Sequence, residues 1–135
     1  MNEKKMSLVE EVFKFLNLNC DYAVLRNYDG LPKKINSRDI DILINRFDFR
    51  THKNQIIEII LRANYKISTY FKNDRIITLV CGKINSENVE LIQFDFFFQT
   101  SAYGQIILTS EIILKDKIFN GNIYHVSKEF EYLDK

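Results

Sequence analysis

The segment Ser37-Arg-Asp-Ile-Asp-Ile-Leu-Ile44 decides the fold that we predict for this chain. Successive side chains on a strand point to opposite faces, so Asp39 and Asp41 emerge together while the isoleucines that alternate with them point into a core. Two carboxylates held side by side on a half-buried strand repel each other unless a cation lies between them. Because Mg²⁺ takes oxygen ligands from one or two carboxylates and from substrate phosphates, the segment predicts a Mg²⁺ (or Mn²⁺) site.

Bulk composition sets the class of protein. The 135 residues are 46% hydrophobic, enough for one domain spanning 1–135 with a real core. Nineteen basic residues against 18 acidic ones give a net charge of +1, which argues against nucleic acid as the main partner. Cys20 and Cys81 are isolated from each other, so we expect no zinc site and a reduced, cytoplasmic setting. Frequent Ile, Asn, Lys, Phe and Tyr are typical of an AT-rich, bacterial genome.

Local patterns predict how the segment is flanked. The capping box Ser7-Leu-Val-Glu10 begins an amphipathic helix that ends near 17–19. Tyr22–Leu25 is a short buried strand, and 27–36 is a loop. A second helix begins at a cap, Asp48 or Thr51, and ends near Ala63. Strands are then predicted over 65–71, 75–83 and 88–98, with a tight turn at 72–74 and a looser one over 82–88, followed by short strands at 106–108, 117–119 and 122–126 around turns at Thr109 and Gly121.

Asp95 is the only charge in the apolar second half of the strand Glu90-Leu-Ile-Gln-Phe-Asp-Phe-Phe-Phe98. If that strand, expected to be antiparallel, pairs beside Asp39–Ile44, three carboxylates converge and can hold one or two Mg²⁺ ions for an in-line phosphoryl displacement. Asp95 would complete the site and accept the proton of the incoming hydroxyl. The alternative is a buried structural Asp95 that is bonded to backbone amides.

From Asp21 to Phe98 the order of strand, loop, Asp-x-Asp strand, helix, strands and third Asp resembles the nucleotidyltransferase superfamily typified by DNA polymerase β and the minimal nucleotidyltransferases. The turn Leu25-Arg-Asn-Tyr28 looks like that of related domains in bacterial polysaccharide-biosynthesis proteins. The resemblance implies an α/β (α+β) fold with a mixed, mostly antiparallel twisted sheet, helices mainly on one face, and carboxylates at one edge. It implies that Asp39, Asp41 and Asp95 are the catalytic, metal-binding residues.

The chain departs from this family in the motif that binds the phosphates of the nucleotide. The family places a Gly-Ser pair at a helix start upstream of the two aspartates, and this chain has none. Arg26, Ser37 and Arg38 are the predicted phosphate contacts in its place, although Arg26 can equally form a structural salt bridge with Asp39 or Asp41.

The expected function is therefore Mg²⁺-dependent transfer of a nucleotidyl group from a nucleoside triphosphate to a hydroxyl or phosphate on a small-molecule or carbohydrate acceptor. The first alternative is a catalytically inactive binding or assembly module of the same fold, which the missing Gly-Ser pair favours. A metal-dependent nuclease is a weaker alternative, since no Glu-x-Lys pair is present.

A helix that begins at Ser127 breaks off at Lys135, so we expect this chain to be the N-terminal part of a longer protein. The base, the acceptor and the oligomeric state are left open.

Overall fold

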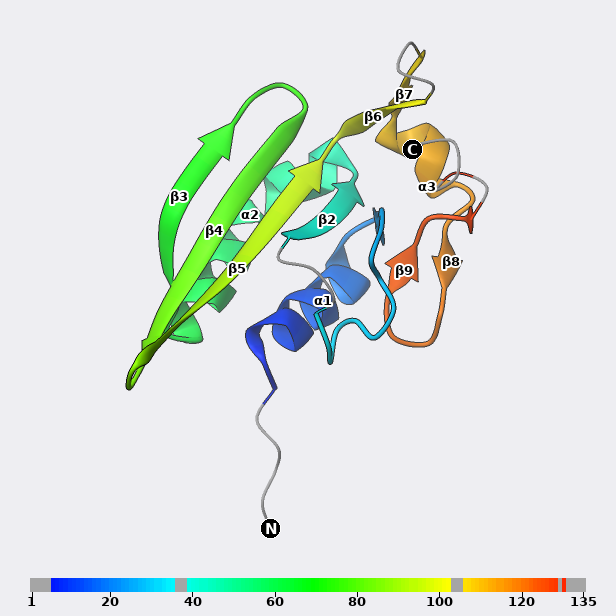
Figure 1. Cartoon of the computed structure of the whole chain (residues 1–135). Coiled ribbons are helices and arrows are strands. Elements are labelled where there is room, and N and C mark those ends of the chain that lie inside the picture. The colour runs from blue at the N-terminus through cyan, green and yellow to red at the C-terminus, as the bar shows by residue number, and fades with distance from the viewer. Residues whose placement is uncertain (1–5, 36–38, 103–105, 129, 131–135) are drawn as a thin grey trace.

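The computed structural model describes residues 6–35, 39–102, 106–128 and 130 (Figure 1). A mixed seven-stranded sheet runs in the order β3-β4-β5-β2-β1-β9-β8, and β6 and β7 form a small separate ribbon. The elements in chain order are α1 (Leu8–Asn19), β1 (Tyr22–Val24), β2 (Asp39–Ile44), α2 (Arg46–Arg62), β3 (Lys66–Lys72), β4 (Ile76–Asn85), β5 (Asn88–Phe97), β6 (Gln99–Ala102), β7 (Ile106–Thr109), α3 (Ser110–Leu114), β8 (Ile118–Phe119) and β9 (Tyr124–His125).

The sheet confirms the predicted class, an α+β domain with mostly antiparallel pairing. Four of the six strand pairs in the large sheet are antiparallel, and two are parallel. One predicted detail is wrong: β5, which carries Asp95, runs parallel to β2. The reason is the connection, because α2 carries the chain back before β3, and the two hairpins that follow give β5 the direction of β3.

The position of the carboxylates within the sheet also differs from the expectation. We expected them at one edge, but β2 and β5 are central strands with neighbours on both sides. The meander of β3, β4 and β5 adds to the sheet on one side of β2, while β1, β9 and β8 extend it on the other. The aspartates therefore lie on a face of the sheet instead of at its rim.

Capping chemistry decides where the first two helices begin. The Ser7 Oγ accepts a hydrogen bond from the Glu10 backbone amide at 3.2 Å, and Glu10 Oε1 accepts one from the Ser7 amide at 3.2 Å, so the predicted capping box is confirmed. The predicted start of the second helix is wrong. Asn45 caps α2 by accepting from the Asp48 backbone amide at 3.0 Å, so the helix begins directly after β2.

Two further local predictions are corrected. β4 continues through Gly82 to Asn85, and residues 86–87 form the tight turn that joins it to β5. The strand passes through Gly82 because Leu91 of β5 packs close to the backbone there, where glycine has no side chain. The segment after Thr109 is the short helix α3 and not a turn. Most of the helix predicted after Ser127 lies outside the described residues.

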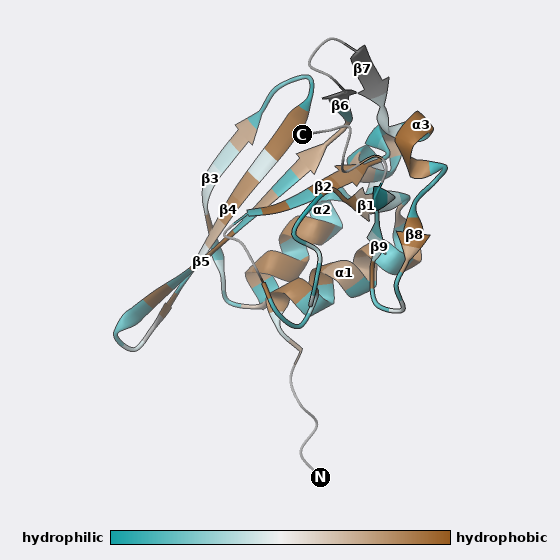
Figure 2. Cartoon of the chain, turned by 45° about the vertical axis from the view of Figure 1, so that its right-hand side comes forward, coloured by the Kyte–Doolittle hydropathy of each residue, from teal (hydrophilic) through white to brown (hydrophobic). Residues whose placement is uncertain are grey.

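The two large helices cover one face of the sheet (Figure 1). Apolar residues of α1 and α2 share a core with alternate residues of the central strands, and Figure 2 shows the brown, apolar stretches of both helices. The members from β2, β4 and β5 are Ile40, Ile42, Ile44, Ile77, Leu79, Cys81, Ile92, Phe94 and Phe96. A smaller cluster on the other face joins Leu43 of β2 and β1 residues to α3. The prediction of helices mainly on one face is confirmed.

Candidate acidic site

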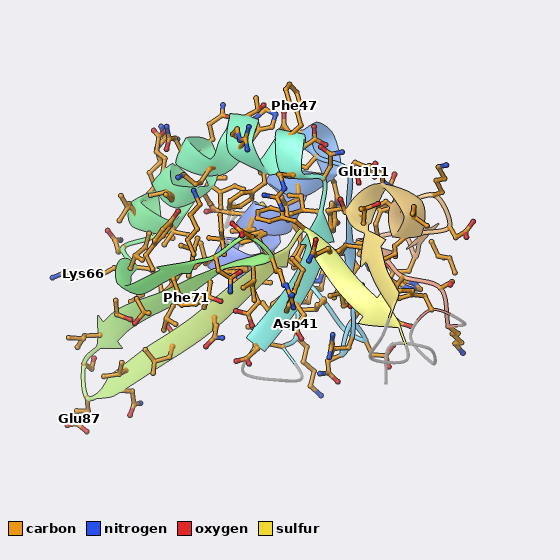
Figure 3. The ribbon with its side chains drawn as sticks, turned by 90° about the horizontal axis from the view of Figure 1, so that it is seen from above. Asp41, Phe47, Lys66, Phe71, Glu87 and Glu111 are labelled. Atoms are coloured by element: carbon orange, nitrogen blue, oxygen red, sulfur yellow. The ribbon has the colours of Figure 1, made fainter. Side chains whose placement is uncertain are left out.

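Asp41 and Asp95 lie directly opposite each other on the neighbouring strands β2 and β5. The same register continues across the sheet, with Asp95 opposite Thr78 of β4 and Thr78 opposite Phe71 of β3. Directly paired residues project from the same face, so Phe71, Thr78, Asp95 and Asp41 form one line, which we call the carboxylate row. In Figure 3, α2 lies on one side of the sheet and Asp41 on the opposite side.

Asp95 is the most enclosed carboxylate of the row, with 7% of its surface exposed. Its Oδ1 accepts a hydrogen bond from Thr78 Oγ1 at 2.7 Å. Gln93 Nε2 donates to both carboxylate oxygens, at 3.1 and 3.2 Å. These donors are side chains of β4 and β5, so the alternative of backbone amide donors to Asp95 does not describe these contacts. They hold the carboxylate in a fixed orientation toward Asp41.

Asp41 is only 16% exposed at its side chain, and its Oδ2 lies 3.2 Å from Arg26 Nε. Burial raises the pKa of this carboxyl from 3.8 to about 6, against the lowering effect of the Arg26 charge. A hydrogen bond with Asp95 and the negative charges of Asp95 and Asp39 raise the pKa further. Both other predicted aspartates therefore act on Asp41 and disfavour its charged form.

The donor chemistry of this site fits a hard divalent cation. Asp41 and Asp95 offer carboxylate oxygens on one face, and Asp39 lies two residues from Asp41 on that face, opposite Gln93. In the part of the chain that the structure describes, however, no three acidic, histidine or cysteine side chains are gathered closely enough to hold a metal ion. A cation would be held by Asp41 and Asp95, with Asp39 drawn in, and Arg26 would have to leave Asp41.

Arg26 is the one predicted phosphate contact that the structure places. It follows Leu25, whose backbone amide donates to the Asp41 carbonyl at 2.9 Å, so its side chain starts beside the acidic pair. The observed ion pair with Asp41 is the structural role that the sequence left open, while 44% exposure keeps the guanidinium in reach of a ligand. Ser37 and Arg38 lie outside the described residues.

Three residues of the carboxylate row and its surroundings are not among the site residues predicted from the sequence. Gln93 carries a usable signal, because it lies two residues from Asp95 and so must share its face. Thr78 and Phe71 carry none, since only the strand register brings them into the carboxylate row. Phe71 is 52% exposed, unusual for a large aromatic side chain on a sheet face.

No protein-family model and no curated protein matches the sequence. Fold and site together define the chain as an α+β domain with an acidic patch on the sheet face opposite α1 and α2. Among the described residues, no helix is long and apolar enough to cross a membrane.

Proposed function

We propose that this domain is a Mg²⁺-dependent nucleotidyltransferase that uses the carboxylate row as its metal site. The observation that carries the proposal is the register of β2 and β5, which sets Asp41 opposite Asp95 on the face of the sheet away from α1 and α2. Like charges in a partly buried position are unfavourable, and a divalent cation removes that cost. Burial is the main cause of the raised pKa of Asp41, and the neighbouring charges of Asp95 and Asp39 add to it.

Each residue then has a defined task. Asp41, Asp95 and Asp39 would hold Mg²⁺, which when bound neutralises charge on the transferring phosphoryl group. Thr78 and Gln93 keep Asp95 oriented, and Asp95 accepts the proton of the acceptor hydroxyl. Arg26, once released from Asp41, binds a phosphate oxygen, together with Ser37 and Arg38 from the preceding loop.

The open face also offers a place for the rest of a nucleotide. Phe71 is separated from Asp41 by three strand spacings, roughly 14 Å at about 4.8 Å each. That span suits a nucleotide whose phosphates lie at the carboxylates and whose base stacks on the exposed ring of Phe71. Two other aromatic side chains already have partners within the fold: Tyr28 stacks on His125, and Tyr70 contacts Lys53 of α2.

The test is a Mn²⁺ titration of the full chain at pH 7.5, followed by electron paramagnetic resonance, with Asp41→Asn and Asp95→Asn as variants. Asp116→Asn is the matched control, because this exposed aspartate lies outside the carboxylate row. We expect saturable binding that either site variant weakens by 100-fold or more and that the control leaves unchanged. Absence of saturable binding to the folded chain would overturn the proposal.

A second candidate function is a binding module of the same fold without catalysis. The ion pair between Arg26 and Asp41 favours it, because that contact satisfies Asp41 without a metal. Pyrophosphate release from a panel of the four nucleoside triphosphates, with sugars and sugar phosphates as acceptors, separates the two. Metal binding with no release for any acceptor in the panel selects the binding module.

A further inference from the structure

We infer that this domain has a second ligand site, a cleft that binds a small soluble molecule bearing two or more phosphate groups. The cleft has a volume of about 300 Å³ and lies between the first half of α2 and the turn joining β3 to β4. Four cationic side chains from two separate elements line it: Arg46, Arg50, Lys53 and Lys72. We call this site the basic cleft.

The basic cleft lies on the opposite side of the sheet from the carboxylate row. Its apolar lining includes Ile77, a member of the core that α1 and α2 share with the sheet. Lys72 follows Phe71 in β3, and neighbouring side chains on a strand point to opposite faces. The row and the cleft therefore cannot hold one and the same phosphate group.

Positive side chains outnumber negative ones among the residues that line the cleft. Asp74 is its only acidic lining residue, and among the described residues none of the four cations forms an ion pair with a carboxylate. The chain as a whole is nearly neutral, at +1, so this concentration of positive charge is local. A cluster in which basic side chains outnumber acidic ones is a usual recognition element for phosphate.

The placement of the two arginines on α2 adds a second observation. Arg46 and Arg50 are four residues apart on one helix, a like-charge spacing that destabilises a helix. Arg46 also lies in the first turn of α2, where the helix dipole disfavours a cation. An anion in the cleft relieves both repulsions, and the forked guanidinium groups suit phosphate oxygens.

One of these arginines is already held in place. Arg46 donates to the Asp74 backbone carbonyl at 2.6 Å, and its guanidinium lies 4.8 Å from the ring centroid of Phe98. Lys53 Nζ lies 3.4 Å from the Tyr70 hydroxyl. Such fixed cations bind an anion with little loss of side-chain freedom, and exposed Arg50 and Lys72 complete the ring of charge.

The test is calorimetric titration of inorganic pyrophosphate into the full chain in EDTA, which keeps divalent metal from drawing the ligand to the carboxylate row. The variant Arg50→Gln with Lys72→Gln removes two cations that make no structural contact described above. Lys66→Gln with Lys115→Gln is the control, since it removes the same charge from exposed positions outside the cleft.

We expect saturable binding, a loss of tenfold or more in the cleft variant, and a change of less than twofold in the control and in Asp41→Asn. Equal weakening in the cleft and control variants would overturn the site, because it would mean that binding follows net charge alone. Association with anionic phospholipid vesicles without binding of pyrophosphate would overturn the assignment to a soluble ligand.

Discussion

The two faces of β2 and β5 are made by alternate residues of the same two strands, and they differ in almost every physical respect. One face presents Ile40, Ile42, Phe94 and Phe96, all 0–2% exposed beneath α1 and α2. The other presents Asp39, Asp41, Gln93 and Asp95, on the side of the sheet away from α1 and α2. The apolar core therefore fixes the register of the two strands, and the register in turn places the acidic groups.

The largest effect is expected on the covered face. Phe96→Ala removes a ring that lies 4.8 Å from Phe49 by centroid, in a position with 0% exposure. The cavity and the lost transfer energy should lower the free energy of unfolding by about 3–5 kcal/mol. Urea denaturation of the variant and of the unaltered chain measures this difference in the free energy of unfolding. A loss below 1 kcal/mol would mean that this face is not the main core.

Asp41→Asn, on the opposite face of the sheet, should raise the free energy of unfolding instead of lowering it. The pKa of Asp41 rises from 3.8 in the unfolded chain to about 6 in the fold, so between these values the native state binds more protons. The free energy of unfolding therefore falls as pH rises from 4 to 6 and stays lower above that. Removing the charge should stabilise the protein by about 1–3 kcal/mol at pH 7.

Urea denaturation at pH 5 and at pH 7 isolates this contribution. The difference in stability between Asp41→Asn and the unaltered chain should be large at pH 7 and smaller at pH 5. An equal difference at both values would show that the charge of Asp41 is not the cause.

The affinity for metal should depend on pH in the opposite direction from the free energy of unfolding, and should rise as the pH rises. A cation at the carboxylate row must displace the proton of Asp41, so Mn²⁺ affinity should fall about tenfold for each pH unit below 6. Titrations at pH 5, 6 and 7.5 measure the slope. A flat profile would indicate that the ion binds without Asp41.

Thr78→Val should have a smaller effect on stability. The change removes the hydroxyl that donates to Asp95 Oδ1 at 2.7 Å while keeping the shape of the side chain. We expect a loss of about 1–2 kcal/mol and metal affinity about tenfold weaker. Thr69→Val, an exposed threonine on β3 two residues before Phe71, is the control and should leave both quantities unchanged.

The smallest effect is expected for Leu91→Ala, the counterpart of Phe96→Ala on the same strand. Leu91 is 56% exposed and lies on the face of the carboxylate row. Truncating it should change the free energy of unfolding by less than about 0.5 kcal/mol. A loss comparable with that of Phe96→Ala would show that the open face is covered in solution.

Sequence patterns captured the parts of this fold that depend on near neighbours. Period-two alternation in Asp39–Ile44 identified both the strand and its buried isoleucines, and the capping box fixed the start of α1. The start of α2 was misplaced because Asn45, Asp48 and Thr51 are all competent caps, and only the observed fold shows that β2 ends where Asn45 can cap. The short helix α3 was missed because five residues give too little periodicity.

The order of residues along the chain is enough to show which side chains are acidic, which alternate with a core, and that Asp39 and Asp41 share a face. Tertiary structure alone decided that Asp95 stands opposite Asp41, that Arg26 pairs with Asp41, and that Thr78 and Phe71 join the same line. It also gathered Lys72 with the cations of α2 in the basic cleft. The physical reason is that strand pairing joins residues far apart in the chain through backbone hydrogen bonds, which carry no side-chain identity, so the packing of the apolar face selects the register.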